Sequence, residues 1–378
     1  GHERGDIELK RVGELLTAIF GTIGEVGRWG GDEFIAVLPN QNVKEIAERS
    51  ERLINQIEED AITVKTSELR LSASIGIAEF PEHSDNLESL VQCADAAMYR
   101  AKELGKGQAF IYESGLYESM TQQVSMVNDL RRTVENHLLD FYIQGKYDLN
   151  GELKGGEVLC RWISGLHGVV SPAVFIPIAE EHKLDSAIGL QALEAACDYI
   201  SIMESQQGDA IPLSVNISAN QMLDPEFPNQ AMSICMDNDV SPEFIELELT
   251  ESVFIRDEKS ALRALNTLRD HGFRLSLDDF GSGFSSLSYL RSFQFEVVKV
   301  DKSLIQGIHQ DSKANALFNG LIAMLKSLQI DVVAEGVELE SYLPFMEQAD
   351  IQLMQGFYFD KPMPYDQFLA RHTTEPNR

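Results

Sequence analysis

Short apolar segments recur eight times after residue 140, and amphipathic stretches separate most of them, which limits the fold more than any other feature. Eight strands with intervening helices over about 235 residues fit a closed α/β barrel better than an open doubly wound sheet. The first two strands follow each other without a helix, which is the one irregularity. The expected strands are 141–149, 156–162, 211–217, 244–250, 274–279, 295–300, 332–335 and a short one near 354–357; the expected helices are 186–205, 258–271 and 313–327.

A smaller α/β unit precedes the barrel. Apolar residues at helical spacing predict a helix over 7–20, so the chain starts inside this unit. The apolar run 34–38 ends at Pro39 and follows Gly30-Gly31, which indicates a hairpin with glycines at its tip. Further expected elements are a helix over 43–58, a strand over 69–78, a helix over 87–104 and a strand over 108–112. We expect domains at 1–115 and 124–373, a linker at 116–123 with a helix from about residue 124, and a tail at 374–378.

The acidic composition narrows the choice of ligands. The chain has 31 Lys and Arg against 60 Asp and Glu, a formal net charge of −29, and no basic stripe, which argues against duplex DNA or RNA. No apolar run approaches the ~18–20 residues of a membrane span. Four dispersed cysteines without a Cys-x-x-Cys pair indicate a reducing, cytoplasmic setting; they are Cys93, Cys160, Cys197 and Cys235.

Polar residues interrupt six of the predicted strands, mostly near their carboxyl ends. In a parallel barrel those ends form one rim, where active sites are built. The residues are Glu157, Asn216, Glu248, Asp278 with Asp279, Lys299 and Glu335.

Carboxylates and an amide oxygen form a site suited to Mg²⁺ or Mn²⁺ rather than zinc or copper. Adjacent Asp278 and Asp279 can hold two ions about 3.5–4 Å apart, as in two-metal phosphodiester hydrolysis. Lys299 adds a cation that can hold water or stabilise charge on phosphate. Each residue alone has a plainer reading: a strand-end acid is usually solvated or salt-bridged, Asp278-Asp279 fits a turn, and Lys299 fits a snorkelling surface lysine. Their coincidence on six strands favours the metal site.

These residues stand in motifs that resemble the EAL domain in order and spacing over about residues 124–373. The motifs are 157–162 (EVLCRW), 215–218 (VNIS), 248–251 (ELTE), 278–287 (DDFGSGFSSL), 299–301 (KVD), 334–338 (AEGVE) and 355–356 (QG). The resemblance implies a TIM-like barrel with one reversed strand. It also implies hydrolysis of cyclic di-GMP to linear pGpG with two Mg²⁺ or Mn²⁺ ions, and a homodimer formed through this domain.

The resemblance also implies a role for each matching residue. Glu157, Asn216, Glu248 and Asp278 match the ligands of one metal, and Asp278 with Asp279 those of the second. Lys299 and Glu335 match the pair that positions and deprotonates water. Glu251 matches the support of the loop after Asp279. Gln355 matches a residue near the attacking water, and Gln144 and Arg161 match substrate contacts.

Three departures leave a second function open. The signature Glu-Ala-Leu reads Glu157-Val158-Leu159, the usual Tyr-Gln-Pro reads Ile143-Gln144-Gly145, and Ser282 replaces a threonine. If the first two loosen substrate placement, the domain is a weakly catalytic receptor of cyclic di-GMP. A pure dimerisation scaffold fits poorly with so many retained ligands.

Residues 1–115 resemble the latter part of a GGDEF domain, an α+β nucleotide-cyclase-like fold. The motifs are 28–34 (RWGGDEF, with Gly30, Gly31, Asp32, Glu33 and Phe34), 74–78 (SIGIA) and 94–102 (ADAAMYRAK). Glu33 matches a metal ligand, and Lys102 and Lys106 match phosphate contacts, so GTP is a candidate ligand. The family's opening strand is absent from this chain and residues 21–24 lack the Arg-x-x-Asp inhibition motif. We therefore expect no cyclase activity and a regulatory or inactive segment.

Overall fold

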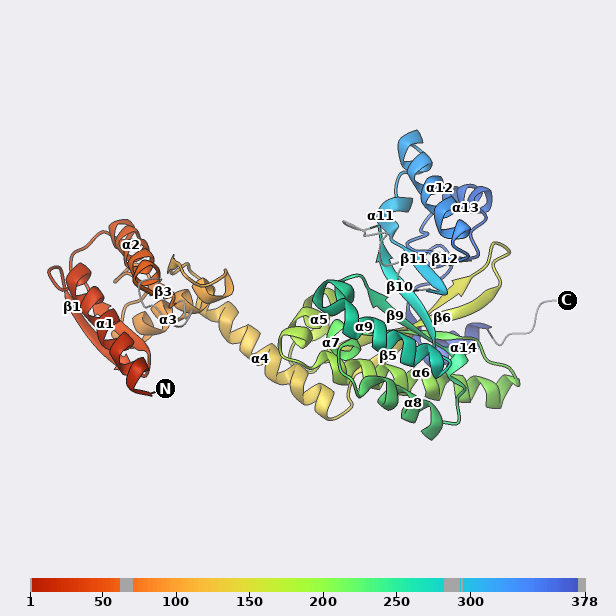
Figure 1. Ribbon diagram of the computed structural model, residues 1–378, viewed down its shortest axis with the longest axis horizontal. Coiled ribbons are helices and arrows are strands. Elements are labelled where there is room, and N and C mark those ends of the chain that lie inside the picture. The colour runs from red at the N-terminus through yellow and green to blue at the C-terminus, as the bar shows by residue number, and fades with distance from the viewer. Residues whose placement is uncertain (1, 62–70, 282–292, 294, 373–378) are drawn as a thin grey trace. The chain divides into compact units, whose positions relative to one another are not determined.

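The computed structural model describes residues 2–61, 71–281, 293 and 295–372 (Figure 1). The chain divides into compact units, Gly1–Ser125 and Met126–Arg378. Each unit has hydrophobic clusters of its own.

The first unit contains the predicted helices and the predicted hairpin. Strands β1 (Glu25–Gly30) and β2 (Glu33–Val37) pair antiparallel, and Gly31 at the turn has a positive φ of 50° that suits glycine. The predicted strand 69–78 is β3 only from Ile75 to Ile77, and residues 69–70 lie outside the described part. The remaining elements are α1 (His2–Phe20), α2 (Val43–Ala61), α3 (Leu87–Glu103) and β4 (Ala109–Ile111), which is parallel to β3.

Helix α4 spans Leu116–Glu135 and begins earlier than residue 124, where the sequence suggested a helix start. The segment 116–123 is therefore helical. Leu116 and Met120, four residues apart, pack on the cluster that contains Cys93 and Tyr112. Two apolar contacts on one face stabilise a turn of helix that the polar composition hides.

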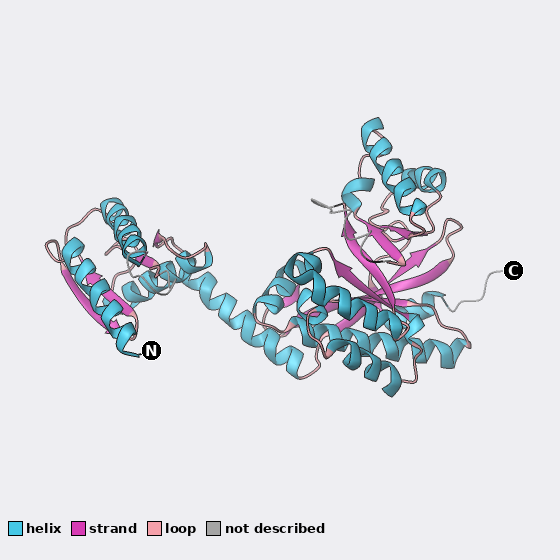
Figure 2. Ribbon diagram, viewed as in Figure 1, coloured by secondary structure: helices cyan, strands magenta, loops and turns pink. Residues whose placement is uncertain are grey.

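The second unit is a closed barrel of eight strands, as predicted (Figures 1 and 2). Neighbouring strands are parallel except β5, which runs antiparallel to both β6 and β13 and closes the barrel. The irregular first pair of strands is thereby explained, because antiparallel neighbours need no crossover helix. In barrel order the strands are β5 (Asp140–Tyr147), β6 (Leu153–Ser164), β8 (Leu213–Asn216), β9 (Ile245–Thr250), β10 (Arg274–Phe280), β11 (Val297–Val300), β12 (Asp331–Ala334) and β13 (Leu353–Met354). Short strands β7 (Gly168–Val170) and β14 (Met363–Pro364) pair with β6 and β5.

Helices surround the barrel and include the three predicted ones, α6 (Asp185–Gln207), α9 (Ser252–Asp270) and α12 (Ser312–Ser327). Helix α9 starts before the predicted residue 258 because two helical pieces join at Asp257, whose φ and ψ are non-helical. Elements that the periodicity did not predict are α5 (Pro172–Glu181), α7 (Ala219–Met222), α8 (Phe227–Asp237), α11 (Lys302–Ile305), α13 (Leu343–Ala349), α14 (Tyr365–His372) and 3-10 turns at Pro242–Phe244 and Glu340–Tyr342.

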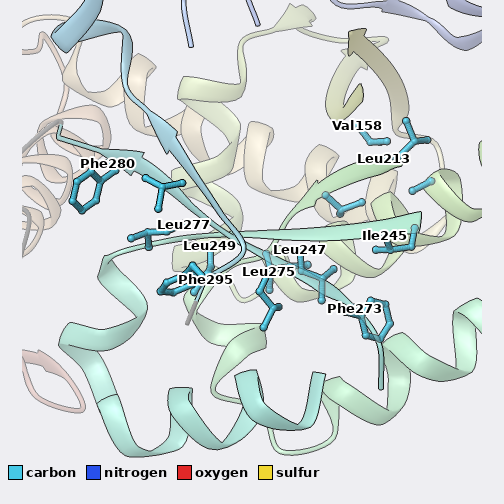
Figure 3. Packing of buried hydrophobic residues seen from close by; sticks show 14 of the residues in the cluster. Val158, Leu213, Ile245, Leu247, Leu249, Phe273, Leu275, Leu277, Phe280 and Phe295 are labelled. Atoms are coloured by element: carbon cyan, nitrogen blue, oxygen red, sulfur yellow. The ribbon is translucent and has the colours of Figure 1, made fainter. Parts of the chain in front are cut away.

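Both faces of the barrel strands are buried, but with different chemistry. On β9 the leucines Leu247 and Leu249 alternate with Glu246 and Glu248, and all four are buried. Figure 3 shows these leucines within the hydrophobic cluster that packs the strands against the helices. Because successive side chains point to opposite faces, the acids lie on the other face, inside the barrel.

Candidate active site

Every strand of the barrel contributes at least one side chain to a single polar network. Each lies on its strand or directly after it, and hydrogen bonds and ion pairs join them. In barrel order they are Gln144, Glu157, Asn216, Glu248, Asp278, Lys299, Glu335 and Gln355.

Lys299 is the centre of this network. Its side chain is 1% exposed, and its Nζ lies near four carboxylates that come from four different strands. The distances are 2.6 Å to Glu248 Oε2, 2.8 Å to Glu335 Oε1, and 3.3 Å to both Glu157 Oε2 and Asp278 Oδ1. The surface-lysine reading of Lys299 is therefore wrong.

A second buried lysine, which the sequence analysis missed, lies beside Glu248. Lys146 Nζ is 2.8 Å from Glu248 Oε1 and 2.8 Å from Glu246 Oε1. Burial lowers the pKa of Lys146, but the two carboxylates outweigh burial and leave that pKa raised. The alternation of side chains along β5 could have predicted this lysine, because Lys146 follows Gln144 by two residues and lies on the same face of the strand.

Burial and the neighbouring lysines shift the pKa values of the acids in different directions. Burial raises the pKa of Glu335 to about 8, and Lys299 offsets only part of this effect. Burial, aided by neighbouring carboxylates, also raises the pKa of Glu157 and of Asp278. Burial acts in the same direction on Glu248, but two lysines outweigh it and hold its pKa at about 2. The ionised carboxylates therefore repel one another, and a bound cation would relieve this repulsion.

The residues fit a pair of divalent cations. Oxygens of Asp278, Asp279 and Glu335 lie within 4.8 Å of one another, and Asp279, with a positive φ of 57°, is exposed at the rim. Burial raises the pKa of Asp279 as well. Together with Glu157, Glu248 and Glu246, these six carboxylates surround two ammonium groups, those of Lys146 and Lys299. Four negative charges are left when all are ionised, and two divalent cations would balance them. Oxygen ligands of this kind suit Mg²⁺ or Mn²⁺.

Amide side chains hold Glu157 from both sides. Asn216 Nδ2 donates to Oε1 at 2.7 Å, and Gln355 Nε2 donates to Oε2 at 2.7 Å. Gln355 Nε2 also lies 3.2 Å from Gln144 Oε1. Among the described residues Gln355 Oε1 is buried without a hydrogen-bond partner, so this oxygen is available to a water molecule or ligand.

Two of the departures lie on the opposite face of their strands. Ile143 and Val158 are fully or almost fully buried in the main hydrophobic cluster, where Figure 3 shows Val158 near Leu213. They alternate with Gln144 and Glu157, which face the polar network. The expectation that these two changes loosen substrate placement therefore has no support from their position.

Gly145, which stands where the usual motif has proline, has a specific partner. Its N–H lies 3.3 Å from both carboxylate oxygens of Asp360, which also accepts from the Tyr147 hydroxyl at 2.7 Å. The carbonyl of Asp360 accepts from Gln144 Nε2 at 3.1 Å. Asp360 is 4% exposed and was not predicted from the sequence. Through these hydrogen bonds Asp360 connects the segment after β13 with β5, close to Gln144.

Among the described residues, two predicted residues have no hydrogen bond or ion pair with the network. Arg161 donates to the carbonyl of Cys160 at 2.8 Å and lies over the ring of Tyr142. Glu251 precedes α9, and most of the loop that it is predicted to support, including Ser282, lies outside the described residues.

In the first unit the predicted motif residues lie on the β1–β2 hairpin. Arg28 donates from Nε and Nη2 to the carbonyl of Gly31 and braces the turn. Asp32 and Glu33 are exposed, as are Lys102 and Lys106, while Phe34 is half-buried near Gly13. Exposure leaves these charged groups accessible to a ligand.

Comparison with known proteins identifies both units. Residues 127–362 match the family model described as EAL domain, and residues 1–108 match that of diguanylate cyclase, GGDEF domain. The chain is 33% identical over 371 residues to the bifunctional diguanylate cyclase/cyclic di-GMP phosphodiesterase MucR of Pseudomonas aeruginosa, covering 98% of this chain and 54% of that protein. It is 30% identical to the cyclic di-GMP phosphodiesterase PdeR of Escherichia coli, covering 96% and 55%.

Solved structures agree with these matches. The MucR phosphodiesterase in complex with c-di-GMP aligns with a TM-score of 0.61 at 32% identity, covering 65% of this chain and all of that chain. The EAL enzyme Bd1971 in its cAMP-bound form aligns with a TM-score of 0.63 at 30% identity, covering 67% and 71%.

The chain spans about half the length of the curated relatives it matches. In the part of the chain that the structure describes, no helix has both the length and the apolar character of a membrane span. Matched along nearly its whole length by proteins with the same two domains, the chain belongs to the GGDEF–EAL family of cyclic di-GMP signalling proteins.

Proposed function

We propose that the EAL domain hydrolyses cyclic di-GMP to linear pGpG with two Mg²⁺ or Mn²⁺ ions. The observation that carries this proposal is the contact of Lys299 with four carboxylates from four strands. A structural arrangement alone would not gather so many acids around one cation, because their mutual repulsion destabilises the fold. The similarity to the MucR phosphodiesterase, whose structure contains c-di-GMP, supports the choice of substrate.

In this proposal Glu157, Asn216, Glu248 and Asp278 would hold one ion, and Asp278 with Asp279 would hold the second. When bound, such ions polarise a phosphate and lower the pKa of water. Asn216 would present its Oδ1, since its Nδ2 donates to Glu157. The side-chain amides of Asn216 and Gln355 keep Glu157 oriented.

Lys299 and Glu335 act on the attacking water. Lys299 would hold the water, and Glu335, 2.8 Å from Lys299 Nζ, would take the proton that the water loses. The water oxygen forms a bond to phosphorus, the bond from phosphorus to one ribose 3′ oxygen breaks, and solvent protonates the released oxygen. Gln144, Gln355 and Arg161 would contact the substrate, and Glu251 would support the loop after Asp279.

The receptor alternative remains the second candidate. It was motivated by residues 143, 145 and 158, and two of these, Ile143 and Val158, lie in the hydrophobic cluster away from the network. The complete set of acids around Lys299 favours turnover over binding alone.

We further propose that the domains are 1–115 and 124–373, that the protein acts in the cytoplasm, and that the EAL domain forms a homodimer. The GGDEF segment is proposed to be regulatory, with GTP as its candidate ligand at the exposed hairpin.

The test is incubation with cyclic di-GMP and Mg²⁺ or Mn²⁺, with and without GTP, followed by chromatography of the products. We expect pGpG from the wild type and none from Glu157→Ala. Equal rates for the two proteins would overturn the catalytic assignment. Tight binding of cyclic di-GMP with no turnover at any metal concentration would establish the receptor alternative.

A further inference from the structure

Lys146 crosses the barrel interior to reach its partners. It lies on β5, whereas Glu246 and Glu248 lie on β9, and β6 and β8 separate these strands around the barrel. All three side chains are at most 8% exposed. Burying a lysine this way is costly unless its charge is fully paired, and here two contacts of 2.8 Å pair it.

The two oxygens of Glu248 are divided between two lysines. Oε1 faces Lys146 and Oε2 faces Lys299. Lys299 has three other carboxylate partners, so it can release Oε2 and remain paired. Lys146 is anchored by Glu246 and keeps its hold on Oε1.

We infer that Lys146 is a positioning residue that commits Glu248 to bind the metal through Oε2 alone. This inference rests on the metal site of the proposed function. Glu246, one pleat below the rim, anchors Lys146 and is not one of the proposed metal ligands. Residues that hold a metal ligand in this way typically change metal affinity or activity by about 10–100-fold when they are removed.

The decisive test compares Lys146→Met with the double variant Lys146→Met/Glu246→Leu. The single variant leaves Glu246 buried without its partner and is expected to be less stable. The double variant removes one charge of each sign and replaces a buried ion pair by apolar side chains, which is often neutral for stability. We therefore expect its melting temperature to approach that of the wild type, although Glu248 no longer has the contact with Lys146.

Two measurements follow, Mn²⁺ affinity by calorimetry without substrate and steady-state hydrolysis of cyclic di-GMP. In the double variant we expect Mn²⁺ binding weaker by about 10–100-fold and a similar fall in kcat, with KM for cyclic di-GMP little changed. Glu246→Gln, which keeps Lys146 on Glu248, should bind Mn²⁺ nearly as the wild type does. The matched control is Lys154→Met/Glu152→Leu, an exposed pair 2.7 Å apart, which should change neither quantity.

A double variant with the Mn²⁺ affinity and kcat of the wild type would show that Lys146 does not position Glu248 for the metal, and would overturn the inference. So would a Glu246→Gln variant as defective in Mn²⁺ binding as the double variant. Wild-type protein that binds Mn²⁺ but releases no pGpG would refute the proposed hydrolysis only, since the calorimetric comparison still tests Lys146. Wild-type protein that binds no Mn²⁺ would refute both.

Discussion

Lys299 Nζ lies 2.8 Å from Oε1 of Glu335, and this ion pair joins the carboxyl ends of the neighbouring strands β11 and β12. Lys299 provides a fixed positive charge next to Glu335, whose pKa is raised by burial. A group that can accept a proton near neutral pH thus lies beside one that can hold water or phosphate.

Lys299→Met and Glu335→Gln should each lower kcat by at least about 100-fold, because each removes one half of the pair that acts on water. Release of pGpG, measured by chromatography, tests this expectation. The control is Lys326→Met, which breaks a pair with exposed Asp350 and should leave kcat unchanged. Wild-type turnover in Glu335→Gln would exclude Glu335 as the base.

Chelation should abolish hydrolysis, and Mn²⁺ or Mg²⁺ should restore it, because the carboxylates otherwise repel one another and take up protons. Asp279→Asn should reduce the number of bound Mn²⁺ ions from two to one, since Asp279 is assigned to the second ion alone. Calorimetry gives the stoichiometry. Full activity in excess chelator would contradict a metal-dependent site.

The metal-free protein should become less stable as pH rises from about 4.5 to about 8. Glu335 has a pKa of about 8 in the folded chain against the model-peptide 4.5, so the folded state binds more protons in this window and loses that advantage as pH increases. The raised pKa values of Glu157 and Asp278 act in the same direction. Melting temperatures between pH 5 and 9 in chelator measure the effect.

Mn²⁺ should flatten this pH dependence, because a bound cation favours the ionised carboxylates. Glu335→Gln should remove part of the slope in chelator. A metal-free melting temperature that rises steadily from pH 5 to 8 would contradict the assigned direction of these shifts.

Gly145→Ala should destabilise the barrel by about 1–3 kcal/mol through overpacking. A Cβ at this position would lie 2.7 Å from Tyr147 Cε2 and 2.8 Å from Leu153 Cδ1. Urea unfolding measures the change. Gly165→Ala is the matched control, because its Cβ would meet nothing within 4 Å, and an equal loss in both variants would rule out the steric cause.

Val158→Ala restores the usual Glu-Ala-Leu signature and should lower stability by about 1–3 kcal/mol without raising kcat. Val158 is 2% exposed within the hydrophobic cluster, on the face of β6 opposite Glu157. Urea unfolding and hydrolysis assays on the same preparation separate the two effects. A large gain in kcat would show that Val158 limits catalysis after all.

Local patterns in the sequence predicted the barrel and much of its site. Apolar segments such as 244–250 and 274–279 lie within two residues of β9 and β10 at both ends, because strand formation follows from nearby apolar residues. Acids at strand ends, such as Glu248 and Asp278, meet because the barrel topology puts those ends on one rim. The same logic failed for residues 116–123, whose helix depends on packing of Leu116 and Met120.

Contacts between distant segments were decided by the tertiary structure alone. Gly145 and Asp360 are 215 positions apart in the chain, and Lys146 and Glu248 are 102 apart. No periodicity relates residues so far apart, since their approach depends on how the barrel closes through the antiparallel strand β5. Sequence alone therefore determined which chemistry the rim offers, whereas the closed barrel decided which lysine reaches which carboxylate and that Val158 faces the hydrophobic core.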